Sequence, residues 1–192
     1  DPAVKFTAML KATYTAIKVV QPDSTVVAGG LARELGPLSP VVFVQHMYAA
    51  GAAGYFDALA MHPYVGPYGL ASDPMNAWSD IARVHQLMAA HGDGDKKIWL
   101  TEIGGPTDCD LCTLLAPILG ALQVTTTQEE QARQILEVFA AAAATDYIGP
   151  VFIYSIRDQC AMPEINGIAH MGALLTNDWQ HKYTAWLLAN AR

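Results

Sequence analysis

The sequence has 192 residues, of which 52% are hydrophobic and 15% charged, a composition typical of one globular domain with a sizeable core. Its formal net charge of -7 is spread without long blocks of like charge, which disfavours nucleic acid and anionic membrane surfaces as partners and leaves neutral or cationic partners open. No apolar stretch approaches the roughly 20 uncharged residues that a membrane span requires.

The order of apolar runs and breakers predicts one leading helix followed by four strand-helix units. Asp1 fits an N-cap with Pro2 in the first helical position, and apolar residues then recur on one face, which predicts a helix over residues 3–20. We expect strands at 24–30, 56–64, 97–102 and 149–158, and further helices at 39–54, at 74–92, after the capping box of Thr127 and Glu130, and at 178–191. This strict alternation predicts an α/β fold with parallel strands.

Two architectures fit this alternation, a doubly wound sheet and part of a (β/α)8 barrel. A nucleotide-binding sheet requires a glycine-rich phosphate loop, and neither G-x-G-x-x-G nor G-x-x-x-x-G-K-[ST] occurs in the sequence. Instead, polar side chains end each of the last three predicted strands: His62 and Tyr64, then Glu102, then Tyr154, Arg157 and Asp158. Such groups gather at the carboxyl-terminal mouth of a barrel, so we favour the barrel.

With these residues, the sequence resembles the (β/α)8 glycoside hydrolases that retain β configuration, which carry one catalytic Glu after strand four and another after strand seven. The likeness is to cellulase-like and exopolysaccharide-hydrolase members, and it spans nearly the whole chain. It rests on "YFDALAMHPY" for strand six, "KIWLTEIGGPT" for strand seven, "GPVFIYSIRD" for strand eight and the closing "GALLTNDWQHKYTAW". The resemblance implies that residues 1–192 form the second half of a barrel, strands five to eight, with Glu102 as the nucleophile.

The chain departs from that family in one important respect, because the Asn-Glu pair that supplies the acid/base after strand four is absent. We expect that pair to lie upstream of Asp1, and the chain, which lacks an initiator Met, to be a processed product, a fragment or an engineered form. A length of 192 residues is also short of the usual size of about 250 for such barrels. Open strand edges would then require a partner, either the N-terminal half of the same protein or a second copy. Alone, the chain is expected to be inactive.

Retaining hydrolysis needs two carboxyl groups about 5–5.5 Å apart, and Glu102 supplies only one of them. An ionised nucleophile requires hydrogen-bond donors, and His62 and Tyr64, two residues apart, point to the same side by strand periodicity. A purely structural alternative for Glu102 is a carboxylate bonded to backbone amides of the following loop. For His62 the structural alternative is a hydrogen bond to a neighbouring backbone group.

Further aromatic residues are assigned by position. Tyr154, or Ile153 beside it, stands where many relatives place a sugar-stacking Trp, and Trp179 is a candidate to line the cleft. Trp99 has opposite parity to Glu102, so we expect it to face the helices, and Trp186 is expected in the core. Arg157 and Asp158 are expected to contribute an ion pair that ties down the last loop.

The leading functional interpretation is therefore a β-glycosidase half that acts on an oligo- or polysaccharide, without metal or cofactor. A non-catalytic carbohydrate-binding or scaffold protein is the alternative, and an α/β-hydrolase domain is disfavoured because G-x-S-x-G is missing. The barrel arrangement puts the loops of Cys109, Cys112 and Cys160 at one face, so we expect a disulfide from one of the first pair to Cys160. Export to the cell envelope or the medium is the matching expectation.

Overall fold

The computed structural model describes residues 1–66, 68–105, 107, 126–158, 174–176 and 178–190. Its elements follow one another in the order α1 (Pro2–Val20), β1 (Val27–Ala32), η1 (Gly36–Leu38), α2 (Pro40–Ala49), β2 (Ala58–His62), α3 (Ser79–Ala90), β3 (Lys97–Ile103), α5 (Gln128–Ala143), β4 (Ile148–Ile153) and α6 (Tyr183–Asn190). The expected disulfide from Cys109 or Cys112 to Cys160 lies outside the described residues.

The strands form one parallel sheet in the order β1-β2-β3-β4, so the expected α/β chain with parallel strands is confirmed. Several elements are shorter than the sequence predicted. The helix expected over 74–92 begins only at Ser79, because the buried Asp73 carboxylate accepts hydrogen bonds from the backbone N–H groups of Met75 and Ala77 and so stabilises a turn there. None of the described helices is long and apolar enough to cross a bilayer.

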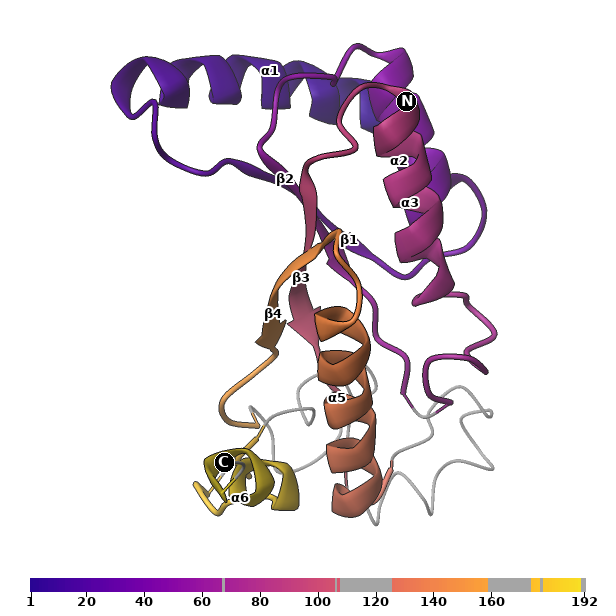
Figure 1. The fold of residues 1–192 in the computed structure, drawn as a ribbon, viewed down its shortest axis with the longest axis vertical. Helices are drawn as coiled ribbons and strands as arrows, with labels where there is room; N and C mark the ends of the chain where they lie inside the picture. Colours follow the sequence, from indigo (N-terminus) through magenta and orange to yellow (C-terminus); the bar gives the residue numbers. More distant parts are fainter. Residues whose placement is uncertain (67, 106, 108–125, 159–173, 177, 191–192) are drawn as a thin grey trace.

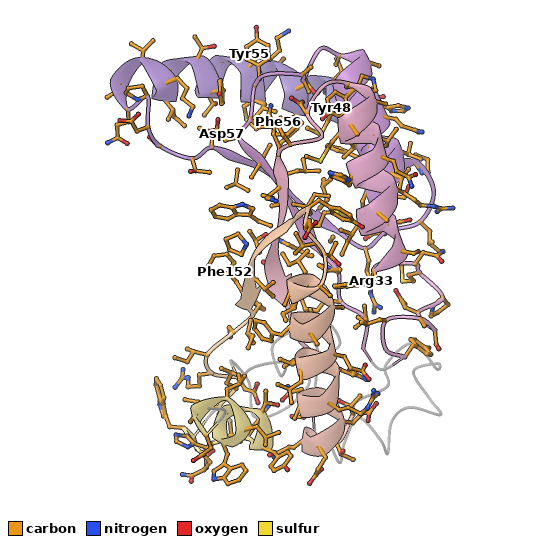
Figure 2. All side chains as sticks on the ribbon, viewed as in Figure 1. Arg33, Tyr48, Tyr55, Phe56, Asp57 and Phe152 are labelled. Carbon is orange, nitrogen blue, oxygen red and sulfur yellow. The ribbon has the colours of Figure 1, made fainter. Side chains whose placement is uncertain are left out.

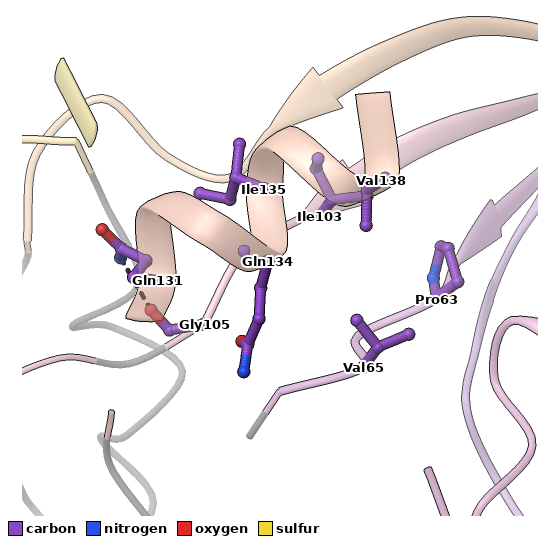
Figure 3. A pocket seen from close by; sticks show the side chains of 9 residues that line it. Pro63, Val65, Ile103, Gly105, Gln131, Gln134, Ile135 and Val138 are labelled. Atoms are coloured by element: carbon purple, nitrogen blue, oxygen red, sulfur yellow. Dashed lines mark hydrogen bonds between the residues drawn. The ribbon is translucent and has the colours of Figure 1, made fainter. Parts of the chain in front are cut away.

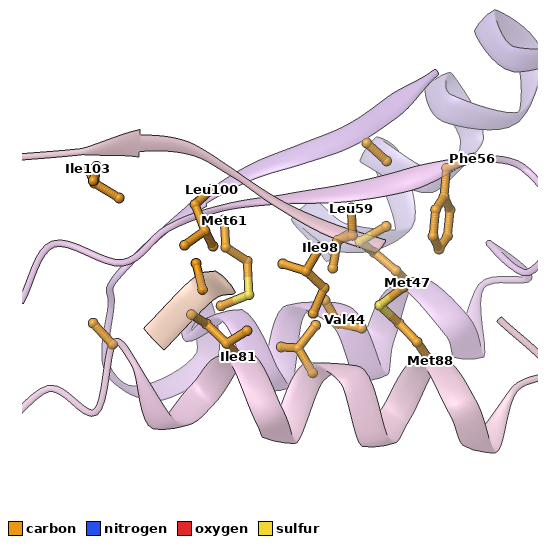
Figure 4. Close-up of a cluster of buried hydrophobic side chains, with 14 of the residues drawn as sticks. Val44, Met47, Phe56, Leu59, Met61, Ile81, Met88, Ile98, Leu100 and Ile103 are labelled. Atoms are coloured by element: carbon orange, nitrogen blue, oxygen red, sulfur yellow. The ribbon is translucent and has the colours of Figure 1, made fainter. Parts of the chain in front are cut away.

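The main core lies between the middle strands and the helices α2 and α3, which cover one side of the sheet (Figure 1). Leu59 and Leu100 are fully buried there, and they face Val44 of α2 and Ile81 of α3 (Figure 4). Full burial of such a side chain contributes about 1.5–3 kcal/mol, so this layer supplies much of the drive to fold.

The amino-terminal ends of the first strands are tied to α1 through Asp57 (Figure 2). The Asp57 carboxylate accepts hydrogen bonds from the Val26 backbone N–H at 2.7 Å and from the Tyr14 hydroxyl at 3.0 Å, and it pairs with the Lys18 ammonium at 2.9 Å. Burial alone would raise the pKa of Asp57, but these donors outweigh it, and the net pKa is lowered. The carboxylate therefore holds the helix on the sheet in its ionised form.

The opposite face of the sheet carries aromatic side chains. Phe152 of β4 is 48% exposed and projects away from α2 and α3 (Figure 2), and Trp99 stacks on it with ring centroids 6.3 Å apart. The prediction that Trp99 faces the helices is wrong, because Ile98 and Leu100 on either side of it occupy the helix-facing positions. Gly149 leaves room for the indole, since a Cβ there would lie 2.8 Å from Trp99 Cδ1.

Trp186 also differs from its prediction. It is 54% exposed and stacks on Tyr183 one turn earlier, with ring centroids 6.0 Å apart. The helix α6 runs only from Tyr183 to Asn190, and Thr184 is its buried residue. Trp186 therefore lies outside the core.

Candidate functional site

Glu102 owes its position to an irregularity near the end of β3. Leu100 pairs with Val151 and Ile103 pairs with Ile153, so three steps along β3 match two steps along β4. An extra residue of this kind is a β-bulge, and it reverses the side-chain alternation beyond it. Thr101 and Glu102 consequently both reach the side chain of His62, while Ile103 remains buried against the helices.

Four side chains meet at the carboxyl ends of β2 and β3. The Tyr64 hydroxyl donates to Glu102 Oε2 at 2.6 Å, and His62 Nδ1 lies 3.5 Å from the same oxygen. The other ring nitrogen of His62, Nε2, lies 3.0 Å from the Thr101 hydroxyl. We refer to Glu102, His62, Tyr64 and Thr101 as the Glu102 cluster. Sequence reasoning had not included Thr101, because an ordinary strand would turn it away from Glu102.

Burial and the charge of Glu102 determine the protonation states of His62 and Tyr64. Burial lowers the pKa of His62, although the Glu102 charge acts in the opposite direction, so the ring is neutral at pH 7. A carboxylate only accepts hydrogen bonds, so the geometry favours the tautomer with Nδ1–H toward Glu102 and Nε2 accepting from Thr101. Burial also raises the pKa of the Tyr64 hydroxyl, and its hydrogen bond to Glu102 adds to that rise. Tyr64 is therefore a permanent donor.

The ring of His62 lies against Gly30 of β1. A Cβ at Gly30 would lie 3.5 Å from both Cε1 and Nε2 of the ring, and the φ of +95° at this position favours glycine. From the sequence alone, the pair Gly29-Gly30 was assigned no role, because it matches neither phosphate-loop motif. A glycine inside a strand can also mark the close approach of another group, and this was the sequence signal for the contact between Gly30 and His62.

The remaining predicted site residues lie after β4. The Tyr154 backbone N–H donates to the Ile103 carbonyl at 2.8 Å, and its side chain interacts electrostatically with Tyr64, so Tyr154 borders the Glu102 cluster. The peptide bond between Tyr154 and Ser155 is cis. Trp179 contacts the guanidinium of Arg157 instead, and it makes no ring contact or hydrogen bond with the Glu102 cluster.

The expected ion pair of the last loop has a different partner. Asp158 pairs with Lys182 at 2.7 Å, and their side chains are only 5% and 2% exposed. Arg157, the neighbour considered in the sequence, lies over the Trp179 ring at 4.7 Å. The pair links Asp158 to Lys182, the residue directly before α6.

A small cavity lies behind the end of β3, on the side of α5 (Figure 3). It is lined by Ile103, Gly105 and Ile135 among others, and Gln131 Nε2 donates to the Gly105 carbonyl at 2.7 Å beside it. Its volume of about 10 Å³ holds at most one water. Glu102, near the end of the same strand, is 32% exposed.

The described residues contain no group of three or more His, Cys, Asp or Glu side chains arranged to hold a metal ion. What the Glu102 cluster offers is one carboxylate, oriented by the Tyr64 hydroxyl and flanked by the neutral ring of His62. Its two contacts are both on Oε2, so in the described part of the chain Oε1 has no hydrogen-bond partner. An oriented carboxylate with one uncommitted oxygen is suited to nucleophilic attack.

Comparisons with known proteins give structural neighbours only. No protein-family model and no curated protein matches this chain. Among solved structures, a family 39 glycoside hydrolase from the gut symbiont Bacteroides cellulosilyticus WH2 matches with a TM-score of 0.66 and 22% identity, over 93% of this chain and 35% of that one. A β-glucuronidase of Lactobacillus rhamnosus matches with a TM-score of 0.59 and 16% identity, over 94% of this chain and 28% of that one. A β-glucuronidase of an uncultured Clostridium sp. matches with a TM-score of 0.51 and 16% identity, over 95% of this chain and 35% of that one.

At these identities the likeness concerns the fold alone. The chain spans between 28% and 35% of the length of these three structures. Its four-stranded parallel sheet with helices on one side is consistent with part of a (β/α)8 barrel.

Proposed function

We propose that this chain is the C-terminal half-barrel, strands five to eight, of a glycoside hydrolase that cleaves β-linked oligo- or polysaccharides with retention of configuration. Glu102 is the nucleophile in this proposal. The observation that carries it is the hydrogen bond of 2.6 Å from the Tyr64 hydroxyl to Glu102 Oε2, at the carboxyl end of a buried parallel strand. Active sites of (β/α)8 barrels lie at that end, and the fold neighbours include glycoside hydrolases.

The proposed chemistry follows from the two oxygens of Glu102. Tyr64 and His62 hold Oε2, and Oε1 attacks the anomeric carbon of the sugar. The bond from that carbon to the leaving oxygen breaks, and the electron pair passes to the oxygen. A covalent glycosyl-enzyme results, which water then hydrolyses. His62, Tyr64, Tyr154 and Trp179 are the proposed sugar-binding residues.

The leaving oxygen needs a proton, and no second carboxyl group contacts Glu102 among the described residues. We propose that the acid/base residue comes from the N-terminal half of the same protein or from a second copy of the chain. Both edge strands support this. In the described part of the chain, β1 and β4 each pair with another strand on one side only. A groove of about 520 Å³ lies between α1 and β1, and another of about 430 Å³ lies between α5 and β4.

A covalent trap tests the nucleophile without the missing acid. A 2-deoxy-2-fluoro-β-glycosyl fluoride carries a leaving group that needs little protonation, and its fluorine at C2 slows hydrolysis of the intermediate. We expect mass spectrometry of the digested protein to find one fluorosugar on the peptide that contains Glu102. Glucosyl, galactosyl, xylosyl and glucuronosyl forms of the reagent cover the sugar that the structure does not identify.

Two variants make the result specific. Glu102→Gln keeps the side-chain volume and removes the charge, and it should take up no label. Glu137→Gln removes a carboxylate from the exposed face of α5 and should be labelled like the parent protein. Label on a residue other than Glu102 would refute the assignment. Binding of oligosaccharides without labelling or turnover would favour the alternative, a non-catalytic carbohydrate-binding protein. A sugar-cleaving role fits an exported protein, which remains the proposed location.

A further inference from the structure

The described residues after β4, at 154–158, 174–176 and 178–182, form a small hydrogen-bonded layer. Arg157 forms a parallel bridge with Leu175, which in turn forms an antiparallel bridge with His181. The backbone N–H of Asp158 donates to the Leu175 carbonyl at 2.9 Å, and that of Lys182 donates to the Leu174 carbonyl at 3.0 Å. The buried Asp158–Lys182 pair connects the two outer pieces of this layer. Side chains that project from it are therefore held in place.

Trp179 projects from the turn that closes this layer. Its backbone N–H donates to the Thr176 carbonyl at 3.1 Å, and the next N–H, that of Gln180, donates to the Thr176 hydroxyl at 2.9 Å. Trp179 has a φ of 68°, which a bulky residue adopts only where its surroundings impose it. The side chain is nevertheless 60% exposed. Strain of this kind, used to present an aromatic ring to solvent, is more typical of a binding surface than of a core.

Arg157 lies beside the exposed ring of Trp179. Its guanidinium lies 4.7 Å from the centre of the Trp179 ring, and it has no ion pair and no hydrogen-bond acceptor within the part of the chain that the structure describes. Arg33, the cation that follows β1 (Figure 2), differs because it pairs with the buried Asp73 at 3.4 Å. In a protein with a net charge of -7, an arginine held on an aromatic ring with its N–H groups uncommitted offers a site for an anion.

This site lies within reach of the Glu102 cluster. Arg157 is three residues beyond Tyr154, and three residues span at most about 10 Å of extended chain. The Tyr154 backbone is hydrogen-bonded to Ile103, the residue after Glu102, and its side chain interacts with Tyr64. A glycan bound over Glu102 can therefore extend onto the Trp179 ring.

We propose that Trp179 and Arg157 form a subsite for a sugar unit that bears a carboxylate, one or more units away from the bond that is cleaved. The exposed edge of the indole contacts the sugar, and the guanidinium beside it binds the carboxylate through paired N–H groups. The substrate class is thus an acidic glycan that contains uronic acid units. This inference rests on the proposed function for its position in a cleft, but its test is a binding measurement that needs no turnover.

The experiment compares ligands that differ only in charge. Calorimetry measures binding of a uronic acid oligosaccharide, of the same oligosaccharide with its carboxylates reduced to alcohols, and of a sulfated oligosaccharide of equal length. The Glu102→Gln protein is used, so that hydrolysis does not interfere. We expect the uronic acid ligand to bind more tightly than both others, and its affinity to fall as salt is added.

Variants assign the effect to the two residues. Arg157→Gln should weaken binding of the acidic ligand about 10- to 100-fold, as expected for the loss of a charged hydrogen-bonded pair, and leave the reduced ligand within about twofold. Arg157→Lys, which keeps the charge but not the planar fork, should be intermediate. Trp179→Ala should weaken both ligands. Arg83→Gln removes an equal charge from the exposed end of an ion pair on α3. It is the matched control and should leave the affinity for both ligands unchanged.

Three results would overturn the inference: unchanged affinity of Arg157→Gln for the acidic ligand, equal affinity of the parent protein for acidic and reduced ligands, or tighter binding of the sulfated one. These outcomes are separate from those of the covalent trap. A protein that labels at Glu102 but ignores the carboxylate keeps the proposed function and loses the subsite. A protein that binds uronic acid units through Arg157 without labelling keeps the subsite and loses the nucleophile.

Discussion

Asp158→Asn should destabilise the protein strongly, because it removes the carboxylate charge with which the buried Lys182 ammonium pairs at 2.7 Å. The two side chains are 5% and 2% exposed, and their charged atoms lie 2.7 Å apart. Water cannot replace the lost carboxylate at such a site. Breaking a buried pair from one side costs about 3–5 kcal/mol, so the free energy of unfolding should fall by that amount.

The size of this effect distinguishes the pair from the ion pairs on the surface. Arg83, with a side chain 63% exposed, pairs with Asp80 on α3, and Arg83→Gln should cost less than about 1 kcal/mol. Asp158→Asn combined with Lys182→Met removes both charges, and this double variant should be more stable than Asp158→Asn alone. The comparison separates the loss of the carboxylate charge from any change in packing.

Urea unfolding followed by tryptophan fluorescence measures the free energies, with circular dichroism to establish that each variant folds. Hydrogen exchange adds a local readout, since the backbone N–H groups of Asp158 and Lys182 close the layer and should lose protection in Asp158→Asn. A cost below about 1 kcal/mol, or a double variant less stable than the single one, would refute the idea that this pair fixes the segment carrying Arg157 and Trp179.

Two further predictions concern the sheet and the Glu102 cluster. Gly149→Ala should lower the free energy of unfolding by about 1–3 kcal/mol, because the new Cβ would lie 2.8 Å from Trp99 Cδ1; an unchanged urea midpoint would contradict this contact. His62 has a lowered pKa in the folded protein, chiefly through burial, so the unfolded chain takes up its proton more readily. The stability this provides is complete above a pH of about 6.5 and is lost as the pH falls from there through the lowered folded value. His62→Gln should therefore show a smaller loss of stability between about pH 7 and pH 5 than the parent protein, and an equal loss would show that other groups dominate that range.

The sequence alone determined the class of fold and the location of the candidate site. Alternation of β-branched runs with capped amphipathic helices leaves few arrangements other than a parallel sheet, and the carboxyl ends of parallel strands meet at one edge. That local logic was enough to expect His62, Tyr64 and Glu102 near one another, and the structure places them in contact.

The tertiary structure decided which way side chains point and what they pair with. Simple alternation put Trp99 among the helices, but it lies on the other face, and the bulge that turns Glu102 toward His62 depends on the register between β3 and β4. No local pattern specifies that register, because it is set by which residues of two distant segments pack together. The same holds for Arg157, whose adjacent Asp158 was its obvious partner. The Asp158 carboxylate pairs with Lys182 in a buried site, and Arg157 lies over the Trp179 ring. Local sequence does not specify these partners, because contacts between residues distant in sequence form only when the chain has folded.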